Sequence, residues 1–239
     1  MIKLSKISLN YGNNTDILKD LDLKLESGSF HFLTGPSGSG KSSLLKLLFL
    51  GHLPSSGKLN IFGKNVSEIS NTELPILRRK IGVVFQDFRL LNHLTVIENV
   101  ALPLQIAGAR KVDIKDHVNE LISWVGLSDK INSLPNTLSD GEKQRISIAR
   151  AMLKKSSIIL LDEATSSLDS ETETKIQEAL KILTENKTTI VIAHRLSTIL
   201  NSNKIYVLDN GNIVASGRHN ELLNESAIYK NFYDRQIKK

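Results

Sequence analysis

The chain has 239 residues, of which 40% are hydrophobic and 23% are charged, and its net charge is +6. This length and balance are typical of a globular protein with a full hydrophobic core, and no apolar run reaches the roughly 18 residues of a membrane span. The lack of cysteine excludes a disulfide framework and a thiolate metal site. Because the basic residues are scattered, no nucleic-acid partner is expected. The N-terminus shows no signal peptide, which predicts a cytoplasmic protein.

The N-terminal segment alternates apolar and polar residues with the period of a β-strand. One run covers residues 2–9, and a second covers residues 17–25 after the polar turn Gly12-Asn13-Asn14. This alternation predicts two antiparallel strands. A short apolar run at residues 30–33 predicts a further strand that leads directly into a glycine-rich stretch.

The glycine-rich stretch fits the pattern G-x-x-x-x-G-K-S/T between a strand and a helix, which is typical of a phosphate-binding loop. Glycines let the backbone approach an anion closely, and the helix start adds N–H groups and a positive dipole end. We expect Lys41 to contact the outer phosphates and Ser42 to ligate Mg²⁺. The alternative is a strand-to-helix turn that binds nothing. The residues are Gly35, Pro36, Ser37, Gly38, Ser39, Gly40, Lys41, Ser42 and Ser43.

The rest of the chain predicts an α/β core with a helical insertion. Strands are expected at residues 58–63, 81–86, 158–163, 189–193, 204–208 and 212–215. Helices are expected at residues 95–106, 113–125, 142–153 and 171–183.

Asp162 and Glu163 follow an unbroken apolar run, Ile158–Leu161, which is typical of a strand buried in a parallel sheet. Ligands of open α/β sheets bind at the carboxyl ends of such strands. We therefore expect Asp162 to hold Mg²⁺ and Glu163 to act as general base on a water molecule. The alternative is that both acids cap the start of the following helix.

Further motifs lie in a fixed order along the chain. Leu138-Ser139-Asp140-Gly141-Glu142 opens a predicted helix about 20 residues before the acidic strand, and His194 follows that strand by about 30 residues. Together with the phosphate loop, this order resembles the ATP-binding-cassette (ABC) ATPases. In the resemblance, Tyr11 matches the aromatic residue that stacks on adenine, Gln86 joins the core to a helical subdomain, and Asp169 lies in a loop that crosses a dimer interface.

The resemblance implies an α/β fold with a P-loop NTPase core, in which a mostly parallel sheet has helices on both faces. It adds an N-terminal antiparallel β subdomain and an inserted α-helical subdomain. The whole chain, residues 1–239, would be one nucleotide-binding domain. Its core would be residues 1–86 and 156–239, and its helical subdomain residues 87–155.

The resemblance also implies how such a domain works. Two copies would close head-to-tail around two ATP molecules, with Lys41 and Ser43 of one copy facing Ser139 and Gly141 of the other. Ser42, Gln86 and Asp162 would surround Mg²⁺, while His194 would contact the γ-phosphate. The assembly would power a transmembrane partner that contacts residues 86–94, at the inner face of the cell membrane.

Asp140 departs from most family signatures, which carry glycine at that position. A carboxylate beside a phosphate should repel ATP unless it points to solvent or caps the helix. The sequence therefore predicts that Asp140→Gly raises activity or ATP-driven dimerisation.

The two halves of the chain resemble different relatives. Residues 77–91 resemble the cell-division ATPase FtsE and the lipoprotein-release ATPases, whereas residues from about 158 resemble exporter-type nucleotide-binding domains. One hypothesis is a chimera joined between residues 145 and 157, and another is a divergent family member. The functional alternatives are a regulatory ATPase that moves no solute and a chimeric domain without a cognate partner.

Overall fold

The computed structural model describes residues 2–12, 15–162, 170–192, 200 and 202–237. Its contacts divide the chain into two compact units. The first unit contains Met1–Arg78, Leu160–Asp162 and Asn186–Lys239, and the second contains Arg79–Ile159 and Glu163–Glu185. The subdomain boundaries at residues 86/87 and 155/156 stay a prediction.

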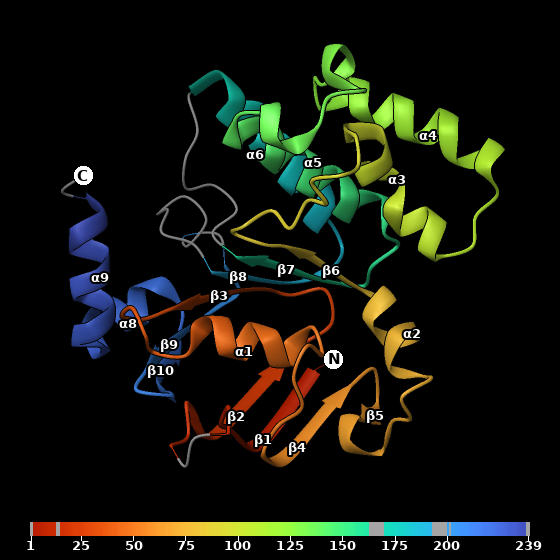
Figure 1. Ribbon diagram of the computed structural model, residues 1–239. Helices are drawn as coiled ribbons and strands as arrows, with labels where there is room; N and C mark the ends of the chain where they lie inside the picture. Colours follow the sequence, from red (N-terminus) through yellow and green to blue (C-terminus); the bar gives the residue numbers. More distant parts are fainter. Residues whose placement is uncertain (1, 13–14, 163–169, 193–199, 201, 238–239) are drawn as a thin grey trace. The chain divides into compact units, whose positions relative to one another are not determined.

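An antiparallel sheet in the first unit has the strand order β2-β1-β4-β5. Its register places Leu4 of the first strand opposite Leu23 and Leu59 of its two neighbours, and all three side chains are buried. The alternation in the sequence thus marks the face that packs into the core, and the predicted antiparallel pair is confirmed. The strands are β1 (Ile2–Leu9), β2 (Leu18–Leu25), β4 (Ser56–Ile61) and β5 (Lys64–Asn65) (Figure 1).

In the second sheet, the strands that lie wholly or partly in the first unit follow the order β10-β9-β3-β8-β7. Its central strand β3 pairs in parallel with β8 and β9, and β10 pairs antiparallel with β9. Four of the five β3 residues are buried, as expected for a strand with a neighbour on each side. The strands are β3 (Phe30–Thr34), β7 (Ile158–Asp162), β8 (Thr188–Ile192), β9 (Lys204–Asp209) and β10 (Asn212–Gly217).

Helix α1 (Lys41–Leu48) buries four leucines, and Figure 1 draws it between β3 and the antiparallel sheet. The short helix α2 (Leu74–Arg79) and the C-terminal helices α8 (His219–Glu225) and α9 (Ala227–Ile237) were not predicted from the sequence. Tyr229 of α9 is fully buried, and its hydroxyl lies 2.7 Å from Nδ1 of His219. The ring of Phe232 lies 6.3 Å from that of Phe32, so aromatic contacts join α9 to the central strand.

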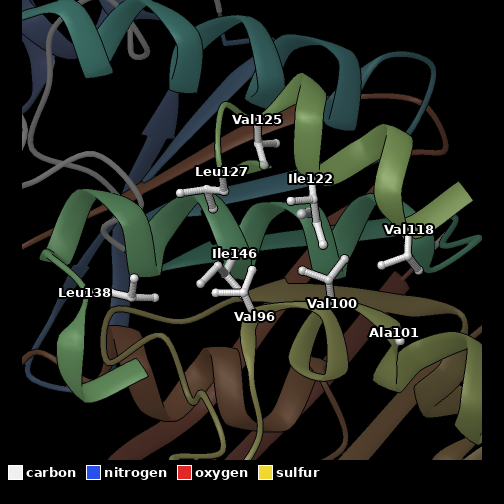
Figure 2. Packing of buried hydrophobic residues seen from close by; sticks show 10 residues of the cluster. Val96, Val100, Ala101, Val118, Ile122, Val125, Leu127, Leu138 and Ile146 are labelled. Carbon is white, nitrogen blue, oxygen red and sulfur yellow. The ribbon is translucent and has the colours of Figure 1, made fainter. Parts of the chain in front are cut away.

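The second unit contains β6 (Ile81–Val84), α3 (Val96–Ile106), α4 (Lys111–Trp124), α5 (Asp140–Leu153) and α6 (Ser170–Thr184). Beside β6 lies the start of β7, where the N–H groups of Ser157 and Ile158 donate to the Lys80 carbonyl. A compact apolar core joins α3, α4 and α5, and Figure 2 shows Val100 and Ile122 among the side chains that meet there. The helices predicted in this region are confirmed.

Several predicted bounds need correction. The strand expected over residues 81–86 ends at Val84, because Phe85 and the following residues turn. The helix expected from Glu142 begins at Asp140, since Ser139 is its N-cap. The strand expected from Lys58 begins at Ser56.

His31 is a buried ring on β3 with one hydrogen-bond partner among the residues that the structure describes. Its Nε2 lies 2.6 Å from Ser29 Oγ, and because that hydroxyl donates to the Glu26 carbonyl, the ring must donate to the oxygen. His31 Nδ1 then lies buried without a partner. Burial, assisted by the positive charge of Lys204, lowers the pKa of His31 to about 4.

We expect His31 to make the protein less stable in mild acid. The unfolded chain, with an ordinary histidine pKa of 6.5, binds a proton that the folded state rejects until about pH 4. Stability from the neutral ring is therefore complete above about pH 6.5 and is lost as the pH falls towards 4, by up to about 3 kcal/mol. Urea unfolding of wild type and His31→Leu between pH 4 and 7.5 measures this. The wild-type advantage should shrink with acid, and a difference independent of pH would contradict the expectation.

Candidate functional site

The glycine-rich loop joins the buried strand β3 to helix α1, as the sequence predicts. Gly35, Gly38 and Gly40 have φ values of 147°, 77° and 103°, which side chains rarely tolerate. A Cβ on Gly35 would overlap the backbone oxygen of Leu208 on β9, whereas a Cβ on Gly38 would meet open space. Gly35 is therefore required by packing, and Gly38 leaves an open approach to the backbone.

Lys41 holds the loop in this shape. Its Nζ donates to the carbonyl oxygens of Gly35 and Pro36, both at 2.8 Å. The first turn of α1 contains no acidic residue of its own, so the helix itself places no carboxylate at the positive end of its dipole. The loop thus offers a lysine ammonium and helix N–H groups to an anion, which is what phosphate binding requires.

Tyr11 lies over the start of α1 and contacts the loop's last residue. The Tyr11 hydroxyl donates to Ser43 Oγ at 3.1 Å. Lys46 Nζ lies 5.3 Å from the centre of the Tyr11 ring, and the His52 ring makes an edge contact at 5.0 Å. The side chain nevertheless remains 41% exposed, so the ring is fixed in place but still open to a ligand.

The predicted acidic strand is present as β7, whose last residue is the half-buried Asp162, and Glu163 lies outside the described residues. In the order β3-β8-β7 it lies two strands from the one that feeds the phosphate loop. Ser42, Gln86 and Asp162 supply hydroxyl, amide and carboxylate oxygens, the hard ligands that suit Mg²⁺. Among the residues that the structure describes, no group of three His, Cys, Asp or Glu side chains could hold a metal.

Gln86 is an exposed residue of the second unit, in the segment that leaves β6. This segment is strained, because Phe88 and Arg89 both have positive φ. It is also held, since Nη1 of Arg150 donates to the Arg89 carbonyl at 2.7 Å. The guanidinium of Arg89 lies 3.8 Å from the centre of the Phe85 ring.

Asn99 of α3 holds the end of the same segment. This fully buried side chain accepts from Leu91 N–H at 2.9 Å and donates to the carbonyls of Leu91 and Leu94. Sequence reasoning missed both Asn99 and Arg150. A polar residue inside the apolar run of α3 was the available signal for Asn99.

Ser139 caps helix α5 through a reciprocal pair with Glu142. Its Oγ accepts from the Glu142 N–H at 3.3 Å, and its own N–H donates to the Glu142 carboxylate at 2.7 Å. Gly141 lies in the first turn and is half-buried. Asp140 is ion-paired with Lys143, with Oδ1 and Nζ 3.0 Å apart, and its side chain is 63% exposed. Asp140 therefore meets the first exception to repulsion, because it faces solvent; Ser139 is the cap of α5, but a carboxylate in the first turn still stabilises the helix N-terminus.

Three predicted site residues, Glu163, Asp169 and His194, lie outside the described residues. The remaining loop residues, Ser37 and Ser39, lie in the loop itself, and Ser39 is buried with an Oγ that has no hydrogen-bond partner within the described part of the chain.

Comparison with known families decides what kind of domain carries this site. The family model described as "ABC transporter" matches residues 18–166. The chain belongs to the ABC transporter family. It is an ATPase domain of that family, as the resemblance implied, and the predicted fold class is confirmed by the solved structures described next.

Two ABC relatives and two solved structures illustrate the likeness. Methionine import ATP-binding protein MetN 1 of Bacillus thuringiensis subsp. konkukian is 38% identical over 90% of this chain and 64% of its own length. MetN 1 of Listeria monocytogenes serotype 4b is 41% identical over 91% of the chain and 66% of its own length. The chain thus spans just under two thirds of these relatives.

The first solved structure is a dimeric, post-hydrolysis state of the ATP-binding cassette MJ0796 bound to ADP and Pi. It has a TM-score of 0.83, is 34% identical, and matches 91% of this chain and 98% of its own. The second is a bacterial Atm1-family ABC exporter with ATP bound, with a TM-score of 0.82 and 34% identity over 98% of this chain and 42% of its own.

These comparisons bear on the two-halves hypothesis. A single ABC relative aligns with 218 residues, which is 90% of the chain, so one kind of cassette accounts for most of both halves. The chimera therefore remains unconfirmed, and nothing among the comparisons supports a cell-division role.

Proposed function

We propose that the chain is the ATP-hydrolysing subunit of an ABC transporter, and that two copies close head-to-tail around two ATP molecules. The observation that carries the proposal is the loop of Gly35 to Ser43, which has the geometry of a phosphate site in a chain of this family. The MJ0796 cassette, described as dimeric and bound to ADP and Pi, supports both the ligand and the dimer.

In the proposed site, Lys41 turns from the loop carbonyls to the outer phosphates, and the loop N–H groups bind the remaining oxygens. Ser42, Gln86 and Asp162 would hold Mg²⁺, which would neutralise charge on the phosphates. Glu163 would take the proton of the attacking water, and His194 would contact the γ-phosphate. Ser139, Gly141 and Asp169 would act across the dimer, so one copy alone provides half of each site.

We further propose that the dimer drives a membrane partner through residues 86–94. Arg150 and Asn99 support this role, because their hydrogen bonds hold the segment at Arg89, Leu91 and Leu94. Within the described residues no helix is long and apolar enough to cross a bilayer. Because the relatives are named import ATP-binding proteins, we propose that the chain associates peripherally with the cytoplasmic side of the membrane through its partner.

Import is the direction that the relatives favour. The two curated relatives are called methionine import ATP-binding proteins, and each matches about 90% of this chain. We therefore propose an importer, with methionine as the first substrate to test. Uptake of labelled methionine by cells with and without the chain measures this, and uptake that is unchanged by its loss would contradict methionine import.

Phosphate release and apparent mass of the purified protein test the proposed function together. We expect turnover of ATP that requires Mg²⁺ and stops in EDTA, and a shift from monomer to dimer in ATP. A protein that fails to bind ATP would refute the whole proposal. Turnover by a strict monomer would refute only the head-to-tail dimer.

Substitutions of Asp140 and Lys143 are expected to have small effects on ATP-driven dimerisation. Because Lys143 already pairs with this carboxylate, we now expect Asp140→Gly to change ATP-driven dimerisation by less than about twofold. Lys143→Met should weaken dimerisation by about two- to fivefold, since it exposes a carboxylate beside the phosphate contact. The double variant Asp140→Asn/Lys143→Met should restore the wild-type level. Sedimentation in ATP measures all three, and a Lys143→Met defect that persists in the double variant would contradict this explanation.

A further inference from the structure

The hydroxyl of Tyr11 has a contact that stacking on a base does not need. It donates to Ser43 Oγ at 3.1 Å across 32 residues of sequence. A phenol is a better proton donor than an alcohol, which favours this direction of the bond. With its oxygen already accepting, Ser43 keeps its own O–H as a donor.

The position of Ser43 decides where that donor can act. Ser43 is the third residue of α1, in the same first turn as Lys41, and its side chain is half-buried. The turn carries no acidic side chain that would take the proton. An anion bound in the loop is therefore the natural acceptor of the Ser43 O–H group.

The Tyr11 side chain is held in place by two neighbours, so its hydroxyl can fix the orientation of Ser43. Lys46 Nζ lies 5.3 Å from the ring centre, and the His52 ring makes an edge contact with centroids 5.0 Å apart. The hydroxyl therefore approaches Ser43 from a constrained ring, which lowers the entropy lost when the bond forms.

We propose that Tyr11 is a positioning residue for phosphate binding, in addition to any role of its ring. Its hydroxyl orients Ser43 so that a relay runs from the Tyr11 O–H to Ser43 Oγ and from the Ser43 O–H to a phosphate oxygen. Linked hydrogen bonds of this kind strengthen one another. The inference rests on the proposed function, because it needs a nucleotide phosphate in the loop.

A double-mutant cycle with Mg²⁺-ATP tests the relay. Tyr11→Phe keeps the aromatic ring and removes only the hydroxyl, so we expect ATP affinity to fall by about three- to tenfold, the usual worth of one hydrogen bond. In a Ser43→Ala background the same change should alter the affinity by less than about 1.5-fold, because the relay is already broken.

Two controls separate the relay from folding and from base stacking. Tyr206→Phe removes another tyrosine hydroxyl, which donates to the Lys24 carbonyl at 2.9 Å, and should leave ATP affinity unchanged. In steady-state turnover, Tyr11→Phe should raise KM and leave kcat unchanged, since the relay binds ground and transition states alike.

The outcomes are distinct. Failure of wild type to bind ATP would refute the proposed function itself. Binding by wild type with equal effects of Tyr11→Phe in both backgrounds would overturn the relay and leave the proposed function intact. A loss of kcat without a change in KM would also overturn it.

Discussion

Glu163→Gln is expected to reduce ATP turnover by about 10²- to 10³-fold, the usual contribution of a general base. The amide keeps the size of the carboxylate but cannot take the proton of the attacking water. ATP binding should persist, because the loop and Lys41 provide the phosphate contacts. The ATP-bound dimer should therefore accumulate, since the step that consumes ATP is blocked.

Single-turnover phosphate release measures the loss of turnover, and size exclusion in ATP measures the accumulation of the dimer. Glu225→Gln provides a matched control, because it makes the same change at an exposed position at the end of α8. If Glu163→Gln hydrolyses ATP as fast as wild type, Glu163 is not the base. If it neither hydrolyses ATP nor dimerises, we would attribute the defect to the residues around Ser139, which are proposed to close over ATP from the other copy.

The phosphate loop could be predicted from sequence because its requirements are local. The loop needs positive φ at Gly38 and Gly40 and a lysine at the start of the helix, and these residues are close together in the sequence. The buried strand β7 was predictable for a similar reason, since the unbroken apolar run Ile158–Leu161 marks it. Both features depend on backbone conformation and burial, which short stretches of sequence encode.

Contacts between distant residues could not be predicted in this way. The hydrogen bond from Tyr11 to Ser43 depends on how the segment after β1 packs against α1. The hydrogen bonds of Asn99 with Leu91 and Leu94 depend on how a loop folds over a helix. The neutralisation of Asp140 by Lys143 was visible as an i,i+3 spacing, but only the described geometry shows the pair at 3.0 Å.

Helices α8 and α9 were missed because both are short: α8 has 7 residues, of which only Leu222 and Leu223 are apolar, and α9 has 11 residues at the C-terminal end of the described chain. Tyr229 and Phe232 anchor α9 by contacts with His219 and Phe32, so tertiary packing decides that the segment is helical. Helix propensity alone is a weak guide for such a segment.

Gly35→Ala is expected to lower the free energy of unfolding by about 3 to 5 kcal/mol and to abolish ATP binding. Gly35 has φ of 147°, and a Cβ there would overlap the backbone oxygen of Leu208. Because that oxygen belongs to the neighbouring strand β9, either the loop or the sheet must shift. A side-chain rotation could not relieve the overlap, in contrast to a clash with a flexible side chain.

Gly63→Ala isolates the contribution of this overlap. Gly63 also has positive φ, at 78°, but a Cβ there would meet nothing within 4 Å. The Gly63→Ala variant should therefore lose only about 1 to 2 kcal/mol of unfolding free energy, the cost of alanine at positive φ, and should retain ATP binding. Urea unfolding and ATP titration of both variants measure the difference. Equal losses of stability in Gly35→Ala and Gly63→Ala would show that backbone strain makes glycine necessary at residue 35, rather than the close approach of the loop to β9. The shape of the phosphate site would then not depend on β9.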